Sequence, residues 1–122
     1  MSRQPWRILI ADDDPTAALL FRAALAGEAF VLTVVDNGID ALAAFESQPF
    51  DLALLDVEMP GMDGIAVCAA IRQARGEDFP VLLVTGRNDS AFLTQAMALS
   101  AGYIAKPLDW AALSGTLRAL LA

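Results

Sequence analysis

The sequence predicts an α/β fold in which helices cover both faces of a five-stranded parallel sheet. Short apolar runs typical of buried strands alternate five times with segments whose apolar residues recur at helical spacing. The connections between successive strands are short enough to favour right-handed crossovers and therefore parallel pairing. If the strand order is 2-1-3-4-5, the sheet is doubly wound and its switch point lies between the first and third strands.

The five strands are predicted from apolar runs bounded by turn residues. Leu52–Leu55 stands between polar turn residues and predicts a central strand buried on both faces. Phe30–Val35 is rich in β-branched residues, which favour strands. The other predicted strands are Arg7–Ala11, Pro80–Val84 and the short segment Tyr103–Ala105.

The helices are predicted from capping residues followed by apolar residues at helical spacing. Asp14 and Pro15 are typical of an N-cap and a first helical residue, and this helix is expected to run to about Ala26. The second helix is expected between the turn at 36–38 and Pro49, the third from Gly64, the fourth over about 89–99, and the last after Asp109 as its cap.

Two of these helices have a predictable buried face. Ile65, Cys68 and Ile71 share one side of the third helix, so we expect Cys68 to pack in the core rather than to act in redox chemistry. The buried side of the last helix is predicted to carry Leu113, Leu117, Leu120 and Leu121.

Length and composition predict one domain over residues 1–122, with a polar leader at 1–6 and no output domain in this chain. The single cysteine excludes an internal disulfide, and the chain shows neither a signal peptide nor an apolar run of membrane-spanning length. We therefore expect a cytoplasmic protein that does not bind a membrane. A net charge of −7 without a basic cluster argues against direct nucleic-acid binding and favours cations or basic partners.

The absence of histidine excludes several classes of site at once. Ser-His-Asp and Cys-His nucleophiles, imidazole metal sites and phosphohistidine carriers all need a residue that this chain lacks. A bound metal would therefore have oxygen ligands. Lys106 is the only lysine, and its position at the end of a predicted strand makes it a candidate site residue.

Distinctive polar residues follow four of the five predicted strands. In a parallel sheet the carboxyl ends of the strands share one edge, where ligands bind in open α/β folds. Carboxylates there suit Mg²⁺, a lysine supplies a positive charge for an anion, and a hydroxyl adds a hydrogen bond. This set fits phosphoryl transfer with a carboxylate nucleophile that forms an aspartyl phosphate. The residues are Asp12 and Asp13, Asp56, Thr85 and Lys106.

Together with their neighbours, these residues resemble the receiver domain of response regulators in two-component signal transduction. The resemblance runs from Ile8 to about Leu121 and includes the motifs Asp12-Asp13, Asp56 with Met59-Pro60-Gly61-Met62-Asp63-Gly64, Thr85-Gly86, and Tyr103 with Lys106-Pro107. It implies a flavodoxin-like (βα)5 fold and a Mg²⁺-dependent transfer of phosphate to Asp56 from a histidine kinase or a histidine phosphotransfer protein. The implied Mg²⁺ ligands are Asp12, Asp13, Asp56 and the main-chain carbonyl of Glu58.

The resemblance also implies a switch. Lys106 would pair with the phosphoryl group across a cis Lys106–Pro107 bond, and Thr85 would move toward that group. Tyr103 would then turn from exposed to buried and alter the surface of the fourth helix, fifth strand and fifth helix, which controls a partner or output domain. Such a protein catalyses its own phosphorylation and dephosphorylation but is a signalling switch rather than a turnover enzyme.

Two features depart from the common pattern or add to it. The sequence before the switch tyrosine is Ser100-Ala101-Gly102 instead of a pair of acidic residues, which is more similar to chemotaxis-type or hybrid-kinase receivers. Glu58 and Arg87 each lie two residues beyond a site residue. We hypothesise that they form an ion pair over the phosphate pocket and slow the entry of water.

Each candidate residue also has an ordinary explanation. Asp12 or Asp13 could be a further helix cap, and Asp56 could be an Asx-turn residue. Plain packing is the corresponding explanation for Thr85, Tyr103 and Trp110.

Three other functions are alternatives to the switch. A receiver-like interaction module that is never phosphorylated would have no need of the complete set of site residues. A metal-dependent phosphatase would need a second Asp two residues after Asp56, where this chain has Glu58. A flavin-binding protein would need a Ser/Thr/Gly-rich phosphate loop after the first strand, where three aspartates stand.

Overall fold

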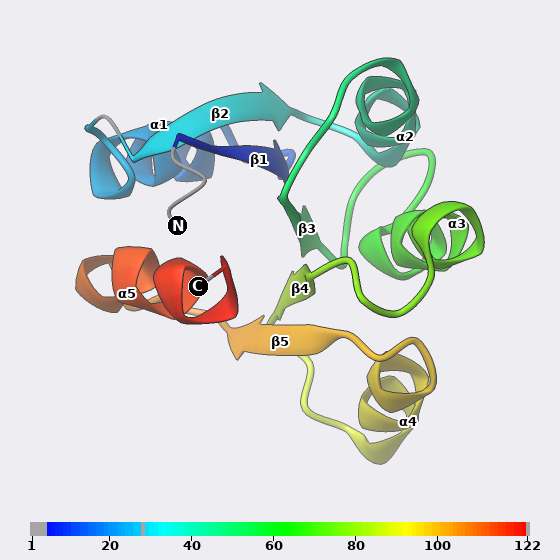
Figure 1. The fold of residues 1–122 in the computed structure, drawn as a ribbon. Helices are drawn as coiled ribbons and strands as arrows, with labels where there is room; N and C mark the ends of the chain where they lie inside the picture. The colour runs from blue at the N-terminus through cyan, green and yellow to red at the C-terminus, as the bar shows by residue number, and fades with distance from the viewer. Residues whose placement is uncertain (1–4, 28, 122) are drawn as a thin grey trace.

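The computed structural model describes residues 5–27 and 29–121, and it confirms the predicted α/β fold. Five parallel strands form one sheet in the order β2-β1-β3-β4-β5. Figure 1 shows this sheet running through the middle of the molecule, with β2 at one edge and β5 at the other. The strands are β1 (Trp6–Ala11), β2 (Phe30–Val35), β3 (Leu52–Asp56), β4 (Val81–Thr85) and β5 (Gly102–Ala105).

Five helices cover the two faces of the sheet. Helices α1 and α5 lie on one face, and α2, α3 and α4 lie on the other (Figure 1). All five begin after an Asp or Asn whose side chain accepts a hydrogen bond from a main-chain N–H of the first turn: Asp14, Asn37, Asp63, Asp89 and, as predicted for the last helix, Asp109. The helices are α1 (Pro15–Ala24), α2 (Gly38–Ser47), α3 (Gly64–Arg75), α4 (Ser90–Ala98) and α5 (Trp110–Leu121).

The core consists of two layers, one on each side of the sheet. Because side chains alternate along a strand, Leu9 and Leu83 pack under α2, α3 and α4, whereas Ile8 and Ile10 pack under α1 and α5. Every residue of β3 and β4 is buried, as expected for central strands of a parallel sheet covered on both faces. Cys68 is buried in the first of these layers, which confirms its predicted packing role.

The structure moves several predicted boundaries. β1 begins at Trp6 rather than Arg7, so the predicted polar leader ends one residue earlier. The Trp6 ring is buried, it lies 5.8 Å from the Phe30 ring, and its main-chain N–H donates to the Ala29 carbonyl. Residues 1–4 of that leader lie outside the described part of the chain. Helix α1 ends at Ala24 instead of Ala26.

One prediction about the last helix was wrong. Leu113 and Leu117 are fully buried and Leu121 is partly buried, but Leu120 is 46% exposed. Helical spacing points Leu120 in nearly the same direction as the buried Leu113, so spacing alone predicts burial; whether a neighbouring element covers the last turn of α5 is decided by the tertiary structure.

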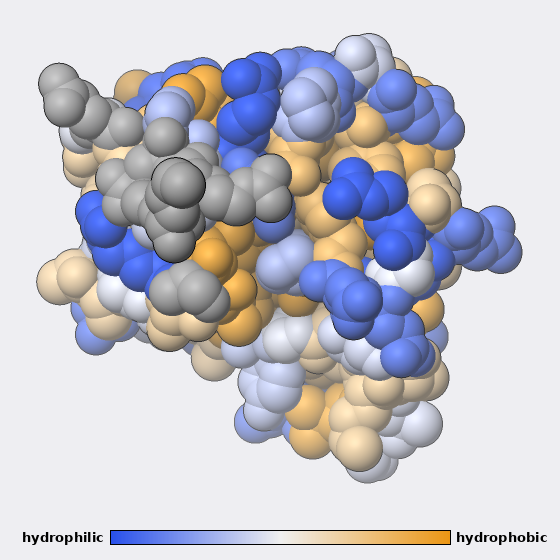
Figure 2. Space-filling model, in the orientation of Figure 1, coloured by the Kyte–Doolittle hydropathy of each residue, from blue (hydrophilic) through white to orange (hydrophobic). Residues whose placement is uncertain are grey.

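The face drawn in Figure 2 carries both hydrophilic and hydrophobic surface. Figure 2 shows hydrophilic residues along the upper and right-hand rim of one face, and hydrophobic surface beside α5 and beside α4. Met97 and Leu19 are the most exposed of the large apolar side chains described. Within residues 5–27 and 29–121, no helix has the length and apolar character that crossing a bilayer requires.

Candidate functional site

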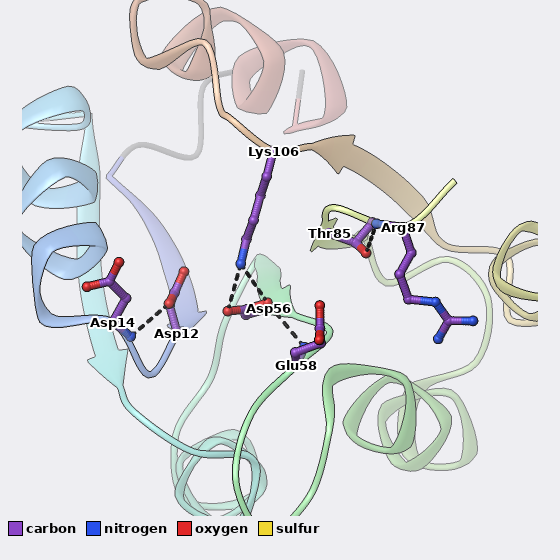
Figure 3. A network of polar contacts seen from close by, with 7 residues as sticks. All are labelled: Asp12, Asp14, Asp56, Glu58, Thr85, Arg87 and Lys106. Atoms are coloured by element: carbon purple, nitrogen blue, oxygen red, sulfur yellow. Dashed lines mark hydrogen bonds and ion pairs between the residues drawn. The ribbon is translucent and has the colours of Figure 1, made fainter. Parts of the chain in front are cut away.

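The candidate site lies where β1, β3, β4 and β5 end side by side. Ala11 pairs with Leu55, Asp56 with Val84, and Thr85 with Ala105, so the residues that follow these strands meet at one edge of the sheet. Figure 3 shows side chains from all four strand ends converging on this edge. The predicted juxtaposition of Asp12, Asp56, Thr85 and Lys106 is therefore observed.

Three carboxylates form the acidic part of the site. Asp12, Asp13 and Asp56 each place one oxygen within 4.8 Å of the others. Asp12 and Asp56 are buried, with 4% and 2% of their surface exposed, whereas Asp13 is exposed. Burial, reinforced by the negative charge of Asp56, raises the pKa of Asp12 to about 6, although the Asp14 N–H and Lys106 act in the opposite direction. Keeping these carboxylates ionised in this pocket therefore costs free energy, which a bound cation would offset.

The chemistry of this group suits Mg²⁺. The ion prefers oxygen ligands at about 2.0–2.1 Å in an octahedron, so opposite ligands lie about 4.2 Å apart. The three oxygens lie within 4.8 Å of one another, so a bound ion would draw them closer together. Asp12, Asp13 and Asp56 would hold the ion. The carboxylate of Glu58 is not part of the group, and its main-chain carbonyl stays a prediction as a ligand.

Lys106 reaches into the same pocket from the end of β5. Its Nζ lies 3.2 Å from both carboxylate oxygens of Asp56 and donates a hydrogen bond to each (Figure 3). Burial lowers the pKa of Lys106, but the hydrogen bonds and charge of Asp56 outweigh that effect and leave the pKa raised. The main-chain N–H of Lys106 donates to the Thr85 carbonyl, and the Lys106–Pro107 bond is cis, as the resemblance implied.

Thr85 ends β4 with only 1% of its surface exposed. Its Oγ accepts a hydrogen bond of 2.8 Å from the main-chain N–H of Arg87. Because the hydroxyl is the acceptor in that contact, its own O–H can still donate to a second group. Thr85 is thus both packed at a strand end and able to act in the site, so the two interpretations do not exclude each other.

Arg87 does not make the hypothesised ion pair with Glu58. Its guanidinium pairs with Asp89 at 3.1 and 3.2 Å, lies 5.5 Å from the centre of the Phe92 ring, and points away from Asp56 (Figure 3). The Arg87 hydrogen bonds, followed by the Phe92 N–H, lower the pKa of Asp89 to about 2. Asp89 is two residues from Arg87, and its role as the N-cap of α4 fixes its carboxylate within reach of the guanidinium.

Tyr103 has its side chain turned outward in this structure. The residue is 49% exposed, and its ring meets the buried Phe92 ring edge-on at a centroid distance of 5.9 Å. This is the exposed orientation from which the resemblance implied a swing. The swing itself stays a prediction.

The pocket extends past the polar residues to an apolar wall that the sequence interpretation missed. A cavity of about 450 Å³ is bordered by the acidic group and Lys106 on one side, and by Leu20, Leu108 and Trp110 on another. Trp110 packs edge-on against Phe21, as its packing role predicted, but it also lines this cavity. Leu20 follows Ala17 by three residues in α1 and both line the cavity, so helical spacing was the available signal.

Comparison with known proteins identifies the family of the chain. The family model of the response regulator receiver domain matches residues 8–118. The chain is 34% identical to the transcriptional activator protein IrlR of Burkholderia pseudomallei, over 94% of this chain and 50% of that protein. It is 36% identical to the DNA-binding response regulator MtrA of Mycolicibacterium smegmatis, over the same shares. The chain thus spans about half the length of these curated relatives.

Solved structures agree in fold. The signal receiver domain of a signal transduction histidine kinase from Syntrophus aciditrophicus matches with a TM-score of 0.85 and 30% identity, over 95% of this chain and 89% of that one. The chemotaxis protein CheY4 of Vibrio cholerae matches with a TM-score of 0.86 and 26% identity, over 95% and 98%. The chain belongs to the response regulator receiver domain family.

Proposed function

We propose that this receiver domain takes a phosphoryl group onto Asp56 in a Mg²⁺-dependent reaction. The observation that carries the proposal is the position of the Asp56 carboxylate, which lies within reach of both the Asp12 and Asp13 carboxylates and the Lys106 ammonium. Within this family, such an arrangement joins a nucleophile, a cation site and a fixed positive charge in one pocket.

The donor has to bring the histidine, because this chain has none. An oxygen of Asp56 attacks the phosphorus of a partner's phosphohistidine, the phosphorus–nitrogen bond breaks, and the electron pair returns to the imidazole. Lys106 is placed to stabilise the negative charge on the transferred group. Bound Mg²⁺ would supply further neutralisation of that charge. Hydrolysis of the aspartyl phosphate by water resets the carboxylate.

The new group would act on Thr85 and Lys106. Three phosphoryl oxygens accept hydrogen bonds strongly, and both side chains have a donor facing this end of the sheet. A shift of Thr85 toward the phosphoryl group would move the Arg87 N–H that is bonded to its hydroxyl, and with it the start of α4. Phe92 links that start to Tyr103, so the surface of α4, β5 and α5 is the expected output.

The partners belong to this proposal as well. A histidine kinase or a histidine phosphotransfer protein would supply the phosphoryl group, and an output domain or separate target would read the changed surface. MtrA is named as a DNA-binding protein, but it is about twice as long as the segment matched here. We therefore assign no direct nucleic-acid contact to these 122 residues. The cytoplasmic location stays a prediction.

The test compares intact masses after incubation with Mg²⁺ and a small-molecule phosphodonor. We expect the wild type to gain one phosphoryl group and Asp56→Asn to gain none. Asp51→Asn is the matched control, since Asp51 lies just before the opposite end of the same strand and bonds the Arg7 N–H; it should be phosphorylated like the wild type. A phosphorylated Asp56→Asn, or an unmodified wild type, would contradict the proposal and favour a constitutive interaction module.

A further inference from the structure

The loop between β3 and α3, residues 57–63, leaves directly from Asp56 and contains Glu58. Among the described residues, its main-chain hydrogen bonds stay within the loop or run to β4 and α3. The Val57 N–H donates to the Val84 carbonyl, the Met62 N–H to the Pro60 carbonyl, and the Gly64 N–H to the Val57 carbonyl. None of these bonds reaches α2. The outer part of the loop must therefore be fixed on that side by packing.

The first residue of α2 provides that packing. Gly38 is buried, and a Cβ built on it would lie 1.8 Å from the carbonyl oxygen and 2.6 Å from the carbonyl carbon of Met62. The contact therefore joins the main chain of α2 to the main chain of the loop. Any side chain at position 38 would push Met62 out of place, because a carbonyl group cannot rotate away as a flexible side chain can.

The neighbouring residue covers the turn of the same loop. Ile39 is 62% exposed, yet a Cβ added to Gly61 would lie 3.2 Å from its Cδ1. Gly61 has φ +79°, a left-handed conformation that favours glycine. The first two residues of α2 thus contact two successive residues of the loop.

The start of α2 is itself firmly held. The Asn37 side chain accepts from the Asp40 N–H at 2.7 Å and donates to the carboxylates of Asp36 and Asp40. At the base of the loop, a Cβ on Gly64 would lie 2.3 Å from the Asp56 carbonyl oxygen, so this contact brings the two ends of the loop together. The loop is therefore held at its base and at Met62 by close approach of bare main chain.

We propose that Gly38 is a positioning residue for the magnesium and phosphoacceptor site. Its main chain sets the place of the β3–α3 loop, and through that loop it sets the orientation of the Asp56 carboxylate and the Glu58 carbonyl. Ile39 supports the same loop from outside. This inference rests on the proposed function for the identity of the ion. It gives α2 a positioning role, although no residue of α2 lines the cavity that contains Asp56.

The test uses Gly38→Ala with Gly115→Ala as its matched control. Gly115 lies in α5, and a Cβ there would meet nothing within 4 Å. Titration calorimetry with MgCl₂ measures the affinity of each folded variant, and amide hydrogen exchange without metal measures the opening of residues 57–63. We expect Gly38→Ala to bind Mg²⁺ roughly ten- to a hundredfold more weakly, as for loss of a group that supports metal ligands, and to exchange faster in that loop. Gly115→Ala should match the wild type in both.

An unchanged Mg²⁺ dissociation constant in folded Gly38→Ala overturns the proposal, as does an equal loss in Gly115→Ala. Should Gly38→Ala fail to fold, Ile39→Ala replaces it, with Val31→Ala as the control, since both residues are exposed β-branched side chains. We then expect weaker Mg²⁺ binding and faster loop exchange in Ile39→Ala alone, and equal effects overturn the proposal. Both measurements omit the phosphodonor, so a wild type that is never phosphorylated contradicts the proposed function without deciding this inference.

Discussion

The centre of the sheet and its β5 edge are built in different ways. All five residues of β3 and all five of β4 are buried, and the phosphoacceptor candidate Asp56 ends the first of these strands. No residue of β5 is fully buried, and α4 buries only Phe92 and Ala96. The candidate phosphoacceptor thus belongs to the closely packed part of the molecule, whereas the candidate switch residue Tyr103 belongs to the thinly packed part.

The two ends of α4, the helix beside the β5 edge, are held by different contacts. Arg72 of α3 donates to the Leu99 carbonyl at 2.6 Å and to the Ser100 carbonyl at 3.1 Å, which ties the segment directly after α4 to α3. The start of α4 is held by the exposed pair of Arg87 and Asp89 and by the Thr85 hydroxyl. A displacement that begins at Thr85 would therefore reach the start of α4 directly, through the Arg87 N–H that is bonded to the Thr85 hydroxyl.

The largest expected effect contrasts two truncations. Leu83→Ala removes a fully buried side chain from β4 and should lower the free energy of unfolding by about 2–5 kcal/mol. Tyr103→Ala on the neighbouring strand removes a half-exposed ring and one edge-on aromatic contact, so about 1 kcal/mol is expected. Urea unfolding of the two variants measures both losses. Equal losses would break the distinction between a rigid centre and a loose edge.

The next effect concerns the acidic group. Because the folded-state pKa of Asp12 is raised to about 6, the folded protein binds this proton more tightly than the unfolded chain does. The free energy of unfolding in EDTA should therefore fall as pH rises from about 4 to about 6, and the cost is fully present above that window. Mg²⁺ at a hundred times its dissociation constant should restore about 2.7 kcal/mol at pH 7.

Thermal unfolding across this pH range, with and without Mg²⁺, measures the effect. Asp12→Asn is the control, since it removes the titrating carboxyl and should flatten the fall. If the free energy of unfolding of the metal-free protein instead rises between about pH 4 and about pH 6, ionisation of Asp12 does not destabilise the fold. The rigid centre would then carry no strain for a cation to relieve.

The smallest effect is expected for Arg87→Ala. The Arg87 and Asp89 side chains are 39% and 52% exposed, so solvent screens their ion pair and it should contribute little to stability. The guanidinium points away from the pocket, and we expect the rate of dephosphorylation to stay the same as in the wild type. Loss of phosphorylated protein over time, followed by intact mass, gives the rate. A clearly faster loss would revive the pairing of Arg87 with Glu58 in the phosphorylated state.

Much of the fold and of the polar site could be predicted because both depend on order along the chain. Parallel strands bring their carboxyl ends to one edge, so a residue that follows an apolar run has a known place before any coordinates exist. That reasoning placed Asp12, Asp56, Thr85 and Lys106 together, and the structure confirms it. The absence of histidine likewise needed only the sequence.

Only the tertiary structure decided which neighbours these residues have. Arg87 pairs with Asp89 rather than with Glu58. Leu20 and Leu108 line the pocket. The main chain of Gly38 lies against the main chain of Met62. Each of these contacts depends on distances of a few ångströms between side chains and loops, and such distances follow from how helices pack on the sheet. The sequence by itself determined which chemical groups stand at the edge of the sheet, because strand direction and order decide that. Their partners and supports were decided by packing, because several groups lie within reach and only the folded geometry selects among them.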